Sequence, residues 1–171
     1  MNSGTLVLDG ARPSVRLERH LPDPPSIVWG AITEPEQLRS WFPCDVVVAG
    51  GRWEVGAALT FPFPPDVIDM TLTGEVLVVD EPNALAFTWG EETLRFELSA
   101  IDGGTRLVLV DELPAGVAAR SAAGWEVCLD RLAGLDPGPG AWQPRFDAYS
   151  AAFEPALGPQ EGPPADYQGG G

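Results

Sequence analysis

Few side chains of this chain could carry out acid–base or nucleophilic chemistry. The single histidine among the 171 residues is His20, and a histidine can act as a general base near neutral pH. No carboxylate partner for it is evident, and no nucleophile elbow accompanies it. The sequence therefore supports neither a Ser-His-Asp nor a Cys-His set, and we predict no catalytic residues.

The same scarcity argues against a metal or a cofactor. One histidine and two separated cysteines, Cys44 and Cys128, do not make the usual zinc ligand sets. Gly50-Gly51 and Gly103-Gly104 lack the spacing and the lysine of a phosphate-binding loop, so we interpret both pairs as tight turns. We predict no metal and no cofactor.

Several acidic residues could still act inside the protein if their side chains point inward. Glu18, Glu75 and Glu97 each lie in a predicted strand, and a buried carboxyl group would have a raised pKa and could orient a polar ligand or act as an acid. Strand alternation places Glu97 on the outside but does not decide the side of Glu75. We interpret Glu91-Glu92 as turn charges and Asp111-Glu112 as strand-end charges.

Composition describes a globular and strongly acidic protein. The hydrophobic content is 44%, and the formal net charge is −15 with a pI near 4.2. That charge repels polyanions, so we expect no nucleic-acid partner and no membrane partner. Residues 1–4 lack the features of a signal peptide, and no apolar run approaches the roughly 20 residues that cross a bilayer. We expect a cytoplasmic protein whose cysteines are reduced.

A sheet and a long helix are predicted to position these side chains. Polar and apolar residues alternate over 15–21, which predicts a strand, and two short helices follow the prolines after it. Between residues 44 and 112, short segments such as 45–49 and 52–55 predict further strands of an antiparallel meander. The fold class is therefore α+β: a bent antiparallel sheet of about six to seven strands wrapped on a long C-terminal helix, with two short helices after the first strand.

The long helix is predicted over 117–135, because Trp125, Cys128, Leu129 and Leu132 recur with helical spacing on one apolar face. A breaker-rich segment follows it. We predict three regions: a domain over 1–135, an extension over 136–157, and a disordered tail over 158–171.

The extension contains an amphipathic pattern of its own. Trp142, Phe146, Tyr149 and Phe153 are spaced at i, i+4, i+7 and i+11, which predicts a helix of about three turns ending at Glu154-Pro155. A short helix is marginal alone in water, so this aromatic stripe must dock. The sequence leaves open whether it docks on its own domain, on a protein partner or on a second copy of the chain.

A series of short motifs occurs in order along the first four-fifths of the chain. The series resembles the motif set of the SRPBCC (START-like) superfamily, and within it the heat-shock protein 90 ATPase activator-like C-terminal domains, over roughly residues 13–134. The motifs are Val28-Trp29, Thr33-Glu34-Pro35, Trp41-Phe42, Gly50-Gly51, Gly74-Glu75-Val76, Phe87-Thr88-Trp89, Gly104-Thr105-Arg106-Leu107 and Gly124-Trp125.

The resemblance implies a helix-grip fold around a cavity. It leaves the function open, because the superfamily includes lipid and polyketide binders, cyclases, chaperone activators and members without an assigned role. Relatives often place a histidine after the Gly-Trp pair of the long helix, whereas this chain has Glu126 there.

We therefore predict a small-molecule-binding protein with an internal cavity for an apolar or aromatic ligand. The alternative that the interior is a solid core stays open, because aromatic residues also fill cores. The predicted wall residues are Trp41, Phe61, Phe63, Met70, Leu72, Phe87, Trp89, Phe96, Trp125 and Leu129.

Two other functions remain open at this stage. An aromatase- or cyclase-like enzyme would need His20, Glu75 or Glu18 to face inward. A chaperone-interacting or regulatory protein would dock through the stripe of Trp142, Phe146, Tyr149 and Phe153.

Overall fold

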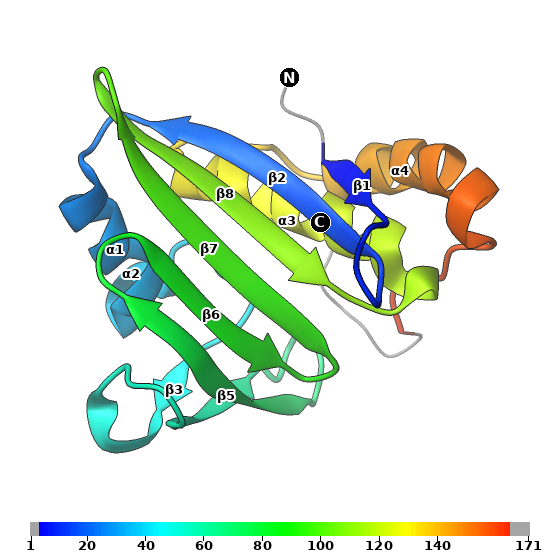
Figure 1. Cartoon of the computed structure of the whole chain (residues 1–171). Coiled ribbons are helices and arrows are strands. Elements are labelled where there is room, and N and C mark those ends of the chain that lie inside the picture. Colours follow the sequence, from blue (N-terminus) through cyan, green and yellow to red (C-terminus); the bar gives the residue numbers. More distant parts are fainter. Residues whose placement is uncertain (1–3, 165–171) are drawn as a thin grey trace.

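The computed structural model describes residues 4–164 and shows one bent sheet with a long helix against its concave face (Figure 1). Every neighbouring pair of strands is antiparallel, and the spatial order is β1-β2-β8-β7-β6-β5-β4-β3. The strands are β1 (Thr5–Val7), β2 (Ser14–Leu21), β3 (Val47–Val48), β4 (Ala58–Pro62), β5 (Thr71–Asp80), β6 (Ala84–Trp89), β7 (Glu92–Ile101) and β8 (Gly104–Glu112).

The helices lie at two ends of this sheet and behind it (Figure 1). Short helices α1 and α2 follow β2, the long helix α3 follows the sheet, and α4 lies beside β1 at the far side. Their bounds are α1 (Pro25–Thr33), α2 (Pro35–Leu38), α3 (Ala118–Leu132) and α4 (Trp142–Leu157), with single 3-10 turns η1 (Ala49–Gly51) and η2 (Ala115–Val117).

The predicted fold class is confirmed, with a slightly higher strand count. The sheet has eight strands instead of six to seven, because Thr5–Val7 adds an edge strand beside β2. The predicted strand at 52–55 is wrong: residues 52–54 have no regular structure, and Val55 begins a turn that leads to β4. This segment carries no ladder hydrogen bonds, and β3 is reduced to two residues at the other edge.

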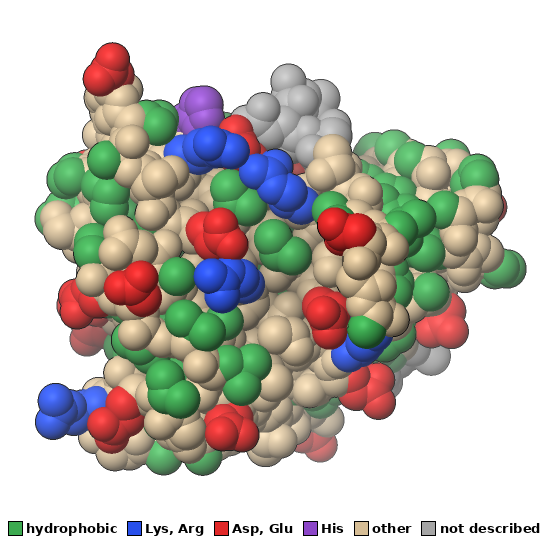
Figure 2. Space-filling model, viewed as in Figure 1, with side chains coloured by type: hydrophobic (Ala, Val, Ile, Leu, Met, Phe, Trp, Pro, Cys, Tyr) green, Lys and Arg blue, Asp and Glu red, His purple; other side chains and the backbone are tan. Residues whose placement is uncertain are grey.

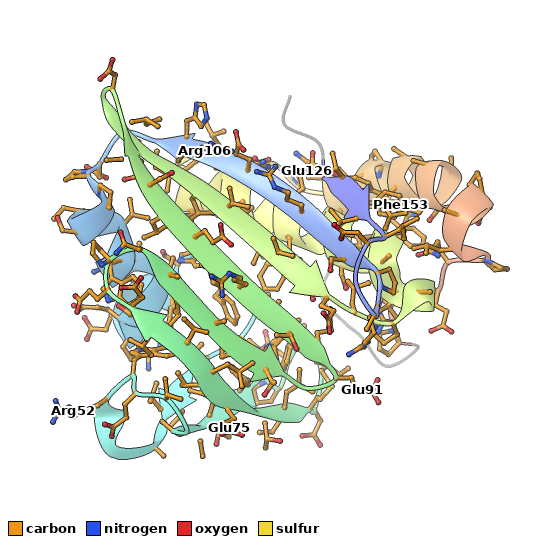
Figure 3. The ribbon with its side chains drawn as sticks, viewed as in Figure 1. Arg52, Glu75, Glu91, Arg106, Glu126 and Phe153 are labelled. Atoms are coloured by element: carbon orange, nitrogen blue, oxygen red, sulfur yellow. The ribbon has the colours of Figure 1, made fainter. Side chains whose placement is uncertain are left out.

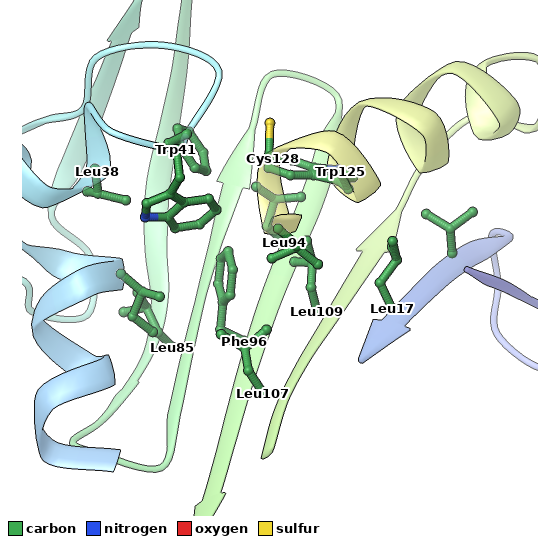
Figure 4. Packing of buried hydrophobic residues seen from close by; sticks show 14 of the residues in the cluster. Leu17, Leu38, Trp41, Leu85, Leu94, Phe96, Leu107, Leu109, Trp125 and Cys128 are labelled. Carbon is green, nitrogen blue, oxygen red and sulfur yellow. The ribbon is translucent and has the colours of Figure 1, made fainter. Parts of the chain in front are cut away.

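The alternating pattern of β2 is confirmed and sets the two faces of the sheet. Val15, Leu17 and Arg19 are buried beneath the sheet, while the residues between them lie on its outer face. The inward residues of β6, β7 and β8 continue this apolar layer toward α3, as Figure 4 shows for Leu85, Leu94 and Leu109 among others.

Two of the glycine motifs have a steric explanation. A Cβ atom at Gly74 would lie 1.9 Å from the carbonyl oxygen of Thr88 on the neighbouring strand. A Cβ atom at Gly104 would lie 1.9 Å from the carbonyl oxygen of Leu21. Both distances are shorter than any real contact, so a larger residue would force these strands apart.

Helix α3 is buried on two sides. Its predicted apolar face packs on the sheet, and Trp125 and Leu129 are almost completely buried there. Glu126, which helical spacing places away from that face, is nevertheless only 4% exposed because α4 covers it. The side of α3 that the pattern marks as polar is therefore an interface within the chain.

A polar network holds α4 on α3. The Tyr149 hydroxyl donates a hydrogen bond to Glu126 and accepts one from the Gly4 N–H at 2.6 Å. Arg145 donates from Nε to Glu126 at 3.0 Å and from Nη2 to Asp130 at 2.9 Å. Burial and the hydrogen bond to Glu126 raise the pKa of Tyr149, so its hydroxyl stays protonated and donates. Each buried carboxylate oxygen of Glu126 therefore has a partner.

The aromatic stripe of the extension packs against its own chain. Tyr149 and Phe153 are buried, and Trp142 stacks on Phe146 with ring centroids 4.8 Å apart. Figure 3 labels Phe153 on α4 and Glu126 on α3. The stripe thus covers α3 of the same chain.

The helix of the extension also runs further than predicted. Helix α4 continues through Pro155 to Leu157 instead of ending at Glu154-Pro155. Beyond it, residues expected to be disordered make hydrogen bonds: Gln160 Oε1 accepts from the Ala119 N–H at 2.9 Å, and Arg120 donates to the Gly162 carbonyl at 2.9 Å. Gln160 therefore satisfies one of the free N–H groups at the start of α3. The remainder of the predicted disordered tail, 165–171, lies outside the described residues.

Phe153→Ala should destabilise the protein by about 3 kcal/mol or more, because it removes a buried ring from the interface between α3 and α4. Phe146→Ala, which truncates a partly buried ring of the same stripe, should cost less. Urea unfolding of both variants measures the two changes. If neither substitution changes the free energy of unfolding, the stripe is not part of the core and is free to dock elsewhere.

Candidate functional site

An aromatic cluster occupies the space between the concave sheet face and α3. Its rings come from β4, β6, β7 and α3, from the segment after α2, and from the chain on either side of β4. Neighbouring rings lie with centroids 5.4–6.5 Å apart. We use the name aromatic cluster for Trp41, Phe42, Trp53, Phe61, Phe63, Phe87, Trp89, Phe96 and Trp125.

Phe42 is the central member of the aromatic cluster. Its ring centroid lies 5.4 Å from that of Trp41, 5.5 Å from Trp125 and 6.0 Å from Trp89. It also contacts Phe61 at 6.5 Å. Phe42 was absent from the predicted wall residues, although the motif Trp41-Phe42 contains it.

Nine of the ten predicted wall residues pack in one core, and four of the ten are half-buried. Most of them belong to the aromatic cluster, and Leu129 is fully buried beside it. The half-buried residues are Phe63, Met70, Leu72 and Trp89, and Met70 lies outside the core. Contact of these side chains with a ligand stays a prediction.

Asp111 is a buried carboxyl group at one end of the aromatic cluster. It is 0% exposed and points inward from β8, where Oδ2 accepts a hydrogen bond from Trp125 Nε1 at 2.8 Å. The interpretation of Asp111 as a strand-end charge is therefore wrong. Asp111 follows Leu107 and Leu109 at a spacing of two, and this period is the signal that could have identified it.

The surroundings of Asp111 favour its neutral form. Burial raises the pKa of Asp111 well above its usual range, and the neighbouring Glu92 carboxyl raises it further, against smaller opposing effects of Trp125 and Arg12. Glu92, interpreted from the sequence as a turn charge, is the first residue of β7 and accepts a hydrogen bond from Ser121 at 3.2 Å. A nearby like charge disfavours ionisation of a carboxyl group, so Glu92 helps to keep Asp111 in its neutral form.

Two buried polar atoms near Trp125 lack a regular hydrogen-bond partner. They are Asp111 Oδ1 and Trp89 Nε1. In the described part of the chain, Ser150 Oγ is the third buried side-chain atom without a partner. Trp89 Nε1 faces the Cys44 thiol, which is only a weak acceptor.

The acid–base candidates from the sequence lie outside the sheet. His20 and Glu75 are exposed, and the Glu18 side chain lies on the outer face, where Arg16 and Arg106 each donate to it at 3.0 Å. These hydrogen bonds lower the pKa of Glu18. The cyclase alternative required one of these three residues to face inward, and none does. Glu97 is exposed, as predicted.

The outer face of the sheet carries paired charges. Figure 2 shows basic and acidic side chains interspersed with hydrophobic ones on this side. A shallow hollow of about 370 Å³ is lined there by Arg16, Arg95 and Arg106 among others. Arg95 forms an ion pair with Glu97 at 2.8 Å, so the acidic neighbours of this hollow offset its arginines.

Both cysteines are buried and free. Burial raises the pKa of Cys44 and of Cys128 to about 12, so neither thiol is a reactive thiolate at neutral pH. Within residues 4–164, no group of three or more His, Cys, Asp or Glu side chains is placed to hold a metal ion. The helices of that part of the chain include none with the length and apolar character to cross a membrane.

A larger groove lies where α1, α2 and the C-terminal end of α3 meet. Its volume is about 570 Å³, within the range of small-molecule sites. Trp41 forms its floor, and Ile27 on its wall is 58% exposed although hydrophobic. We call this hollow the Trp41 groove. Its lining residues are Leu21, Pro22, Asp23, Ile27, Val28, Ala31, Glu36, Gln37, Ser40, Trp41, Leu132, Ala133 and Gly134.

Hydrogen bonds hold the floor of the Trp41 groove in place. The Trp41 indole N–H donates to the Ala31 carbonyl at 2.9 Å, and Trp53 donates to the Thr33 carbonyl at 2.8 Å. The two indoles thus satisfy free carbonyl groups at the end of α1. On its inner side the Trp41 ring contacts Phe42 and Phe96, so this residue joins the groove to the aromatic cluster.

Asp111→Asn should make the protein more stable at neutral pH than the unsubstituted protein. Because its pKa is raised in the folded state, Asp111 contributes stability fully below its usual pKa of 3.8 and loses that contribution as the pH rises through the raised value. Asparagine removes this loss of stability and still accepts the hydrogen bond from Trp125. The free energy of unfolding, measured with urea between about pH 4 and pH 8, tests this prediction.

The matched control is Glu112→Gln at the next residue of β8. The stability difference between Asp111→Asn and the unsubstituted protein should widen with pH, while that of the control should not. Parallel curves for the two variants would contradict a raised pKa at Asp111.

The fold is shared with several solved structures. CalU16 from Micromonospora echinospora is 22% identical with a TM-score of 0.67, and the match covers 90% of this chain and 96% of that one. A conserved protein of unknown function from Enterococcus faecalis, EF2215, is 23% identical with a TM-score of 0.72 and coverages of 89% and 91%. DynU16, a protein in the dynemicin biosynthetic locus, is 25% identical with a TM-score of 0.61, over 71% of this chain and 46% of that one.

No curated protein matches the sequence significantly. The family model described as activator of Hsp90 ATPase homolog 1-like protein matches residues 23–135. These residues include strands β3 to β8, helices α1 and α2, and the whole of α3. That match confirms the resemblance of the motif series to the SRPBCC superfamily. The chain belongs to the family of activator of Hsp90 ATPase homolog 1-like proteins.

Proposed function

We propose that this protein binds an apolar or aromatic small molecule, and that the ligand sits in the Trp41 groove. The observation that carries the proposal is a hollow of about 570 Å³ with a buried tryptophan as its floor. Small-molecule sites are concave, mostly apolar and supplied with a few polar groups. In this groove Gln37 and Ser40 supply neutral polar groups beside apolar walls.

The rigidity of the floor supports the proposal. Trp41 is held from behind by Phe42 and Phe96 and is fixed by its hydrogen bond to Ala31. A ligand in this groove would cover its apolar lining without first ordering the Trp41 side chain, which lowers the free-energy cost of binding. Covering Ile27, now 58% exposed, adds to the gain.

The aromatic cluster supplies a second, deeper surface. The predicted wall residues other than Trp41 would contact a ligand only if the rings between the sheet and α3 moved apart. Such a movement breaks contacts such as that between Trp89 and Trp125, whose centroids are 5.4 Å apart. The groove needs no such movement, so we place the ligand there. The similarity to DynU16, a protein in a biosynthetic locus, accords with a small-molecule ligand.

Biphenyl-4-ylmethanol, a neutral two-ring probe, should bind saturably in a calorimetric titration. Ala31→Trp should weaken this binding by about tenfold or more, equal to about 1.4 kcal/mol, because the added indole fills the groove. Ala148→Trp is the matched control, because it adds the same side chain at an exposed position of α4.

The fold of both variants is checked by their thermal unfolding. Equal affinities for Ala31→Trp and Ala148→Trp would show that the ligand binds elsewhere. The absence of saturable binding by this probe and by the charged probes described below would contradict the proposed function.

A further inference from the structure

The walls of the Trp41 groove carry negative charge and no cationic side chain. Asp23 and Glu36 line opposite parts of the groove, one before α1 and one on α2, and both residues are exposed. None of the lining residues is an arginine, lysine or histidine. Arg39, adjacent to the groove in sequence, forms an ion pair with Asp45 at 3.1 Å instead.

The end of α3 adds little to this negative potential. Leu132, Ala133 and Gly134 line the groove where α3 ends. The last carbonyl groups of a helix carry the negative end of its dipole, but here those of Leu129, Asp130 and Arg131 accept backbone hydrogen bonds within the chain, and Arg131 places a cation in the last turn. The negative charge of the groove therefore comes from its two carboxylates.

The start of α1, which also borders the groove, offers little opposing positive charge. Pro25 has no N–H group. The N–H groups of Ile27 and Val28 both donate to the Pro24 carbonyl, at 2.9 and 3.1 Å. The positive end of this helix is therefore largely satisfied within the chain.

We infer that the ligand of the Trp41 groove is a cationic apolar molecule, with a hydrophobic body over Trp41 and an ammonium group between Asp23 and Glu36. This inference rests on the proposed function and names its ligand class. An ammonium group is attracted to the two carboxylates. The net charge of −15 concentrates cations around the whole protein and assists their approach.

Three probes with one body and different charges test the inference. They are biphenyl-4-ylmethylammonium, biphenyl-4-ylmethanol and biphenyl-4-carboxylate. At low ionic strength the ammonium compound should bind about fivefold or more tightly than the alcohol, because each exposed charge pair adds a modest gain. The carboxylate should bind most weakly, and added salt should reduce the difference.

Matched variants separate the groove from the overall charge. Asp23→Asn combined with Glu36→Gln should remove most of the preference for the ammonium probe and leave the binding of the alcohol unchanged. Asp69→Asn combined with Glu154→Gln changes the net charge equally at exposed positions outside the groove lining, and should keep the preference.

Each result has one meaning. Equal binding of the ammonium and alcohol probes overturns the inference while the proposed function stands. A preference reduced equally in both double variants also overturns it, because the charge of the whole protein would then explain the selectivity. If no probe binds, the proposed function itself fails.

Discussion

The contact between α3 and the concave face of the sheet is the constraint on which the rest of the structure depends. A strongly bent sheet with a single helix behind it encloses more space than aliphatic side chains fill, and rings fill it here. Trp125 lies at the centre of this contact. Its ring packs against those of Phe42 and Trp89, and its indole N–H donates a hydrogen bond to Asp111. The segment after α2 is held in place because it supplies Trp41 and Phe42 to the same cluster. Helix α4 completes the arrangement from behind by covering Glu126.

The hollow proposed as the ligand site lies at the edge of the fold, where α1, α2 and the end of α3 meet. The rings between the sheet and α3 pack at centroid distances of 5.4–6.5 Å. At the Trp41 groove, a ring of the interior also borders a hollow. A site of this kind suits a family whose members share a scaffold and differ in function, because much of its lining comes from the short helices and the end of α3.

Much of the fold could be predicted because its signals are local. The alternation of β2, the helical face of Trp125 and Leu129, and the stripe of Tyr149 and Phe153 each report which side of one element is buried. The site was less predictable because it depends on contacts between elements. Asp111 looked like a strand-end charge because its burial comes from α3, which follows it in the chain, and Glu126 looked exposed because α4 covers it. The groove is only partly marked by motifs: Val28 and Trp41 belong to them, whereas its other walls meet only after folding.

The most direct test of this account is the response of individual tryptophan indole N–H signals to biphenyl-4-ylmethanol in proton–nitrogen correlation spectra. Substitution of each tryptophan by phenylalanine assigns the signals. The account predicts a saturable shift of the Trp41 signal, with those of Trp89 and Trp125 nearly unchanged because the aromatic cluster stays packed. Large shifts of Trp89 and Trp125 with Trp41 unaffected would place the ligand between the sheet and α3 and contradict a groove site.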